Sequence, residues 1–292
     1  MDKRKNAMLG AFIADALALG PHWIYDTDKI YKVFGEIEGI VAPLKDTFHK
    51  TKKKGEFTHY GDQMLMLIEY NHKTSGAFNK EDFLKYYYGW IQSYDGYLDH
   101  ATKETISNIE NGIYEGSTSE ELAGILSVPV MYFLSENYKR DSLERTKATH
   151  NSALVINIVE FMIDLLNLIE EGYDISDAIE KLEDQQPSII AELIKMGRSK
   201  INEEPIKTIK EFGQMCSGKN AFPSSIYLLL KYEDDFKTAL LKNVQAGGDS
   251  AARGIMIGTI LGAYHGIDVL PQEWMNDIQQ FDEILAMKNP DN

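Results

Sequence analysis

Hydrophobic and polar residues follow the helical period of three to four positions in almost every patterned segment of this chain. Runs that alternate at every second residue, with β-branched side chains and flanking turns, are nearly absent. The pattern therefore predicts an all-α fold. The predicted helices cover residues 5–19, 63–72, 80–94, 101–114, 120–133, 150–170, 177–196, 205–215, 223–231 and 234–244, with a further helix after residue 249 and a short one from residue 271. Residues 27–58 are predicted to be irregular.

Small residues recur at every fourth position in the first helix and in the helix after residue 249. They are Gly10, Ala14 and Ala18 in the former, and Gly254, Gly258 and Gly262 in the latter. Residues four apart lie on one face of a helix. Because glycine inside a helix costs about 1 kcal/mol relative to alanine, a stripe of three needs a compensating contact. We predict that the two small-residue faces pack together with their backbones very close.

The glycine-rich helix follows the sequence Gly247-Gly248-Asp249-Ser250. Aspartate and serine are preferred N-cap residues, so we expect the helix to begin at Asp249 or Ser250. A carboxylate at the start of a buried helix has two interpretations, a cap or an acid of a functional site, and the pattern alone leaves both open.

Composition narrows the class of protein. The 292 residues, without an internal repeat or a linker rich in Pro, Gly or Ser, predict one domain over residues 1–292. The net charge of −15 argues against nucleic acid or an anionic membrane as the main partner. The one cysteine, Cys216, excludes an internal disulfide and favours a reducing compartment. Asp15 argues against a signal peptide, and no stretch is long and apolar enough to span a bilayer, so we expect a cytoplasmic protein.

Candidate chemistry is confined to acids and histidines near predicted helix ends. Asp15 lies in an otherwise apolar helix, where it either caps a neighbouring backbone or faces a polar cavity. His22 ends the first helix, His59 precedes another, and His150 is predicted to start one. The basic run at residues 50–54 is either a surface loop or a flap that brings positive charge to a phosphate-bearing ligand.

Taken in order, these segments resemble the ADP-ribosylglycohydrolase superfamily over nearly the whole chain. The matching motifs are Ile13-Ala-Asp-Ala-Leu-Ala18, Tyr60-Gly-Asp-Gln63, Ser127-Val-Pro129, Thr149-His-Asn151 and Gly247-Gly-Asp-Ser-Ala251. The last block is the most specific. The resemblance implies the all-α fold of that superfamily, and hydrolysis of the bond between ADP-ribose and an acceptor with the help of two Mg²⁺ ions.

The resemblance places Asp62 and Asp249 on acids that hold Mg²⁺ in the superfamily, and it implies both as catalytic and metal-binding residues. The remaining acids of that metal site are missing here. Gly61 replaces the first of a pair, Ala251 replaces the second acid of the late block, and His22 lies nearest the early acid. Because Mg²⁺ prefers oxygen ligands, two carboxylates are too few for two ions, and we expect at most one weakly bound Mg²⁺.

Arg253 lies four residues after Asp249, on the same face of the helix, so an ion pair between them is possible. Two interpretations follow. The guanidinium partly takes the charge role of a missing metal ion, or the two residues form an ordinary surface pair that contributes little stability.

The leading functional hypothesis is a hydrolase that cleaves a glycosidic bond of an ADP-ribosylated protein or small molecule. One of Asp62 and Asp249 would act as general base, and both would face a shared cleft. The residues expected to bind substrate are His22, His59, Tyr60, Gln63, His150, Gly247, Gly248, Ser250 and Arg253. The alternative is a catalytically silent relative that binds ADP-ribose or a nucleotide, or has a structural role like the lens crystallins of the same superfamily.

Overall fold

The structure, a computed structural model, describes residues 2–287, and within this range the regular elements are sixteen α-helices and two short 3₁₀ helices, with no strand. The first eight α-helices are α1 (Lys3–Ala18), α2 (Thr27–Phe34), α3 (His59–Lys73), α4 (Lys80–Ser93), α5 (His100–Glu110), α6 (Ser127–Leu134), α7 (Tyr138–Thr149) and α8 (Ala153–Glu171). The others are α9 (Ile175–Glu183), α10 (Ser188–Ser199), α11 (Pro205–Phe212), α12 (Gly218–Lys231), α13 (Phe236–Gln245), α14 (Ser250–His265), α15 (Gln272–Asp277) and α16 (Phe281–Ala286), with η1 (Leu122–Leu126) and η2 (Ile267–Val269). The predicted all-α class is confirmed.

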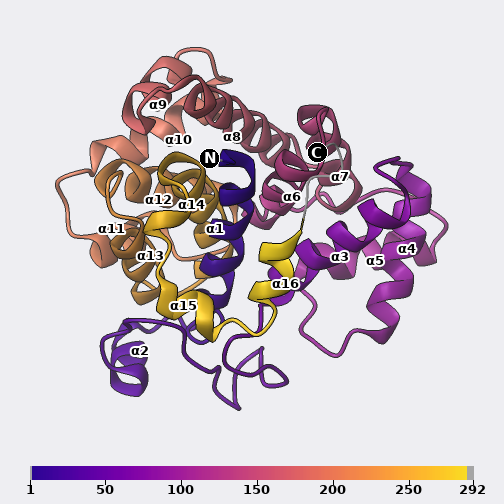
Figure 1. Cartoon of the computed structure of the whole chain (residues 1–292), viewed down its shortest axis with the longest axis horizontal. Coiled ribbons are helices and arrows are strands. Elements are labelled where there is room, and N and C mark those ends of the chain that lie inside the picture. Colours follow the sequence, from indigo (N-terminus) through magenta and orange to yellow (C-terminus); the bar gives the residue numbers. More distant parts are fainter. Residues whose placement is uncertain (1, 288–292) are drawn as a thin grey trace.

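Helices α1 and α14 form the centre of the fold, although almost the whole chain separates them in sequence (Figure 1). Their predicted glycine contact is present. A Cβ built on Gly10 would lie 2.0 Å from the carbonyl oxygen of Gly258, and one on Gly262 would lie 2.4 Å from that of Asn6. Only glycine permits this approach, which explains its place in the helix interior despite its unfavourable helix propensity.

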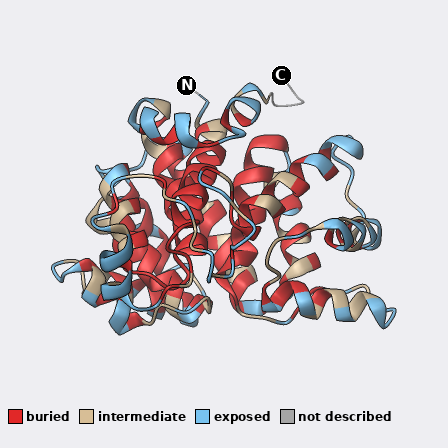
Figure 2. Cartoon of the chain, turned by 90° about the horizontal axis from the view of Figure 1, so that it is seen from below, coloured by how far each residue is buried: buried red, intermediate tan, exposed pale blue. Residues whose placement is uncertain are grey.

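Buried residues concentrate on the central helices and exposed ones on the periphery (Figure 2). Helix α8 illustrates the rule, because most of its apolar positions are buried while its polar stripe is half-buried. That stripe consists of Asn157, Glu160, Asp164 and Asn167. None of the helices among residues 2–287 is long and apolar enough to cross a membrane.

Several sequence-based boundaries are wrong, and no helix is predicted at residues 138–149, which form α7. Residues 27–34 form α2, capped by Asp26, inside the segment predicted to be irregular. The single helix predicted at 177–196 is two helices, α9 and α10, separated by a turn before Pro187. His150 does not start a helix, because it is the C-cap of α7. By contrast, Asp249 is confirmed as the N-cap of α14.

Candidate active site

The turn after α1 is tied to the Gly247-Gly248 turn before α14 by two backbone hydrogen bonds. The amide of Trp23 donates to the carbonyl of Gly248 at 2.8 Å, and the amide of Gly248 donates to the carbonyl of Ile24 at 2.9 Å. Both glycines have positive φ, 70° and 64°, and a Cβ on Gly248 would lie 2.2 Å from the carbonyl oxygen of Gln214. These glycines therefore allow the turn to insert between two other segments, and they bring Asp249 next to the first helix.

Asp249 is fully buried at the N-terminus of α14. Its Oδ1 accepts hydrogen bonds from the amide of Ala252 at 3.1 Å and from Nε2 of His22 at 3.0 Å. The helix dipole and these two donors stabilise the carboxylate anion. Its other oxygen, Oδ2, is buried and has no hydrogen-bond partner among the described residues. A buried acceptor without a partner is rare and indicates a position prepared for a ligand, a water molecule or a proton.

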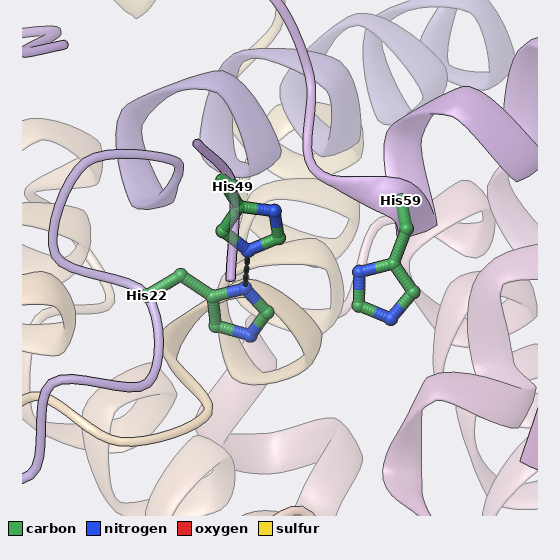
Figure 3. Close-up of side chains that lie close together, drawn as sticks. All are labelled: His22, His49 and His59. Atoms are coloured by element: carbon green, nitrogen blue, oxygen red, sulfur yellow. Dashed lines mark hydrogen bonds between the residues drawn. The ribbon is translucent and has the colours of Figure 1, made fainter. Parts of the chain in front are cut away.

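Three buried histidine rings lie close together (Figure 3), and one of them, His22, contacts Asp249. Nδ1 of His22 lies 2.7 Å from Nε2 of His49, and Nε2 of His59 lies 3.2 Å from Oδ2 of Asp99. Burial lowers the pKa of His22 and that of His49, so both rings are neutral at pH 7. Burial acts to raise the pKa of Asp99, but the stronger combined effect of His59 and other neighbours holds it below its usual range.

A half-exposed aromatic rim covers the histidines. The ring of Trp23 stacks on His22 at a centroid distance of 4.3 Å and meets Tyr97 edge-on at 4.8 Å. Phe48, of which 51% is exposed, packs against Tyr97 at 4.9 Å. Beneath them, the predicted site residue Tyr60 is fully buried against His59, at 3.9 Å between ring centroids. The rim offers flat apolar surface at the point where the buried cluster meets solvent.

Glu121 is a third carboxyl group at this cluster, after Asp249 and Asp99. Backbone hydrogen bonds from Leu122 to Cys216 and from Gly218 to Glu120 hold its segment in place, at 2.7 Å each. Burial, with the charges of Asp99 and Asp249, raises the pKa of Glu121 to about 7. At neutral pH this group is therefore poised to give or take a proton.

Asp62 lies in a different environment from Asp249. Its Oδ2 accepts hydrogen bonds from Nζ of Lys52 and from the hydroxyl of Tyr94, each at 2.5 Å. Burial raises the pKa of Asp62, and Lys52 partly offsets this effect. The basic segment at residues 50–54 thus places one lysine against a protein carboxylate.

The carboxylates present do not fit a pair of Mg²⁺ ions. Oδ2 of Asp62 is engaged by Lys52 and Tyr94, and a Cβ on Gly61 would lie only 2.3 Å from Oδ2 of Asp15, so the missing acid has no space there. Asp15 itself accepts hydrogen bonds from the amide and hydroxyl of Thr58 at 2.8 and 2.6 Å. Hard-cation sites need several free oxygen donors, and this arrangement does not supply them.

The ion pair considered between Arg253 and Asp249 is absent from the described residues. Arg253 is fully buried, so it is not part of a surface pair either. Its guanidinium donates to Oδ1 of Asn243 at 2.9 Å and to the carbonyl of Gly247 at 2.5 Å. These bonds hold the glycine turn that carries Asp249 in place.

The other predicted site residues divide between the cluster and the scaffold. Gln63 lies in a buried network with Tyr87 and Thr102, at 3.3 and 3.5 Å. Nδ1 of His150 lies 3.0 Å from the hydroxyl of Thr149, while its Nε2 is buried without a partner in the described part of the chain. The hydroxyl of Ser250 is buried and equally unpartnered there.

Sequence reasoning missed His49, Asp99 and Glu121. His49 lies in the segment predicted to be irregular, Asp99 is the N-cap of α5, and Glu121 precedes η1. Only the Asp99 cap has a local signal, because aspartate before a helical pattern is a recognised N-terminus signature. The other two come to the cluster through tertiary contacts alone.

A surface groove of about 970 Å³ lies away from this cluster. It runs along η2, α15 and α16, from Ile267 to Leu285, and includes neither Asp249 nor the histidines. Chemistry rather than size therefore locates the candidate site.

The fold is all-helical within the described residues, and its first and late helices bring buried acids together at a Gly-Gly-Asp turn. The family model described as ADP-ribosylglycohydrolase matches residues 1–289, and the chain belongs to this family.

The chain is also similar to individual proteins and to a solved structure. Crystallin J1A of Tripedalia cystophora is 22% identical, over 97% of this chain and 94% of its own length. ADP-ribosyl-[dinitrogen reductase] glycohydrolase of Rhodospirillum rubrum is 31% identical over 67 residues, which is 20% of this chain and 23% of the relative. A solved structure titled "ADP-ribosylglycohydrolase-related protein complex" shares the fold, with a TM-score of 0.74, 17% identity, and coverage of 98% of this chain and 95% of the other.

Proposed function

We propose that this protein hydrolyses the glycosidic bond between ADP-ribose and an acceptor, with Asp249 and Glu121 as its acid–base pair. The observation that carries the proposal is the buried Oδ2 of Asp249, which has no hydrogen-bond partner among the described residues. An anion held by a helix N-terminus and by His22, with one oxygen unused, is suited to accept a proton from water.

Glu121 complements this base. Its pKa, raised to about 7, leaves a substantial protonated fraction at neutral pH. In the proposed reaction, water attacks the anomeric carbon of the ribose and Asp249 takes a proton from that water. The bond to the acceptor breaks, Glu121 donates a proton to the leaving atom, and exchange with solvent restores both groups. The half-exposed Trp23 and Tyr97 are suited to hold a sugar or base by stacking.

The test is release of ADP-ribose from arginine-linked and serine-linked ADP-ribosylated protein by the full-length chain. We expect Asp249→Asn and Glu121→Gln each to lower kcat/KM by about 100-fold or more. The neighbouring Glu120 is the matched control, because its side chain is 43% exposed and pairs with Lys219 at the surface. Glu120→Gln should keep full activity. Full activity in Asp249→Asn would refute the assignment.

A second candidate function is binding of ADP-ribose without turnover, or a structural role. It is favoured by the engagement of Asp62 with Lys52 and Tyr94, and by the end-to-end similarity to a crystallin. Calorimetric titration with ADP-ribose separates the cases. Binding without product release from any linkage supports a binding protein, whereas neither binding nor release supports the structural role.

A further inference from the structure

His22, His49 and His59 converge from three separate segments: the turn after α1, an irregular loop, and the first position of α3. One ring nitrogen of each lies within 4.8 Å of those of the other two. All three residues are at most 1% exposed. Figure 3 shows the ring of His59 with one nitrogen directed toward the His22–His49 pair.

Hydrogen bonds define which nitrogens are free. A carboxylate only accepts, so the Nε2 atoms of His22 and His59, which face Asp249 and Asp99 at 3.0 and 3.2 Å, carry the hydrogens. In neutral rings this leaves lone pairs on both Nδ1 atoms. Nδ1 of His59 is buried and has no hydrogen-bond partner within residues 2–287. A histidine whose remote nitrogen is fixed by a carboxylate while its other lone pair is unused has the usual arrangement of a metal ligand.

The charges around the cluster favour a cation. Asp249 and Asp99 are fully or almost fully buried, at 0% and 2% exposure. Among the described residues, the ion-pair partners of these two carboxylates are His22 and His59, with no lysine or arginine. Buried anions need compensation, and a dication between the imidazoles would provide it.

We propose that Nδ1 of His22, Nε2 of His49 and Nδ1 of His59 bind a transition-metal dication of the zinc class, oriented by Asp249 and Asp99. Neutral imidazole suits Zn²⁺ and not Mg²⁺, which prefers oxygen. The ion replaces the hydrogen that now bridges His22 and His49, and His49 then carries its hydrogen on Nδ1. Zinc–nitrogen bonds of about 2.0–2.1 Å require modest ring movements: the 2.7 Å contact opens and His59 moves inward.

The experiment uses full-length protein freed of metal with a chelator, and it does not depend on any hydrolytic activity. Calorimetric titration with Zn²⁺ should give one ion per chain. Co²⁺ should give the visible absorption of a low-symmetry, four- or five-coordinate site, and Mg²⁺ in excess should not displace either ion.

Variants place the ion. His49→Asn and His59→Asn should abolish stoichiometric binding and the Co²⁺ spectrum, and Asp99→Asn should weaken binding by about 10–100-fold. His72→Asn and His100→Asn are matched controls, because both histidines are exposed, and they should bind as the wild type does. Far-UV circular dichroism confirms that each variant is folded. Absence of stoichiometric Zn²⁺ binding to the wild type, or its retention in folded His49→Asn and His59→Asn, would overturn the proposal.

Discussion

Replacing Gly258 by alanine tests whether close backbone contact explains the glycine stripe. The added Cβ would lie 2.2 Å from the carbonyl oxygen of Gly10 and 2.9 Å from the Cβ of Ala14, whereas ordinary contact begins at 3.4 Å. The first of these atoms belongs to the backbone of α1 and the second is a Cβ atom fixed to that backbone, so a change of rotamer cannot relieve either contact. Helices α1 and α14 must therefore move apart.

The expected loss follows from two opposing effects. Overpacking of a close helix contact costs about 1–3 kcal/mol, and the upper end applies because a backbone must shift. Alanine regains about 1 kcal/mol of helix propensity. The net destabilisation is about 2 kcal/mol, which lowers Tm by about 3 °C in a chain of this length. Urea titration monitored by circular dichroism, together with a thermal scan, measures both quantities.

Gly89 provides the matched control. It lies in α4, is exposed, and a Cβ built on it would meet nothing within 4 Å. Gly89→Ala should therefore stabilise the protein by up to about 1 kcal/mol. The two substitutions are chemically identical, so they should shift the unfolding midpoint in opposite directions. If Gly258→Ala stabilises the protein as Gly89→Ala does, the contact is not what selects glycine.

Other predictions concern single buried groups. Burial raises the pKa of Asp15 from 3.8 to about 7, so the folded chain binds this proton more tightly than the unfolded chain does. Protonation of Asp15 therefore increases the free energy of unfolding. This contribution is complete below about pH 4 and is lost as the pH rises toward 7. Asp15→Asn should remove this slope in urea midpoints, and an unchanged slope would contradict it. Lys52→Met should lower the free energy of unfolding by about 1–3 kcal/mol, because it leaves the buried Asp62 carboxylate without its ion-pair partner. Adding Asp62→Asn should restore most of this loss, and no recovery would exclude the pair as the cause. Trp274→Phe should cost about 1 kcal/mol, measured by the same titration, because the indole donates to the carbonyl of Glu38 at 3.0 Å; a neutral effect would count against this bond.

The contact between α1 and α14 could be predicted from sequence because its signal is local on each helix. Small residues at every fourth position identify the face on which another helix can approach closely, and few other segments have such a face. The Asp249 cap was equally predictable, since the N-cap preference acts within a few residues.

Helix α7 was missed for the opposite reason. Its buried face contains Asp141, Ser142, Arg145 and Thr146, so it lacks an apolar period. The guanidinium of Arg145 is buried, and its hydrogen bonds to Asn71 at 3.0 Å and to the carbonyl of Asp141 at 3.3 Å offset the cost of that burial. A polar residue satisfied by a distant partner resembles a surface residue in sequence. His49 and Glu121 escaped detection in the same way, because their partners come from other segments.

The pairing of α1 with α14 also constrains how this chain folds during its synthesis. Helix α1 leaves the ribosome long before its partner α14, which begins at residue 250. At about 5–20 residues per second, roughly 10–50 s pass before α14 emerges. Throughout that interval an apolar helix with a narrow glycine face has no native surface to cover it. We therefore expect the nascent chain to need chaperone protection until α14 is made, and truncations that remove α14 to cause aggregation rather than a shortened folded protein.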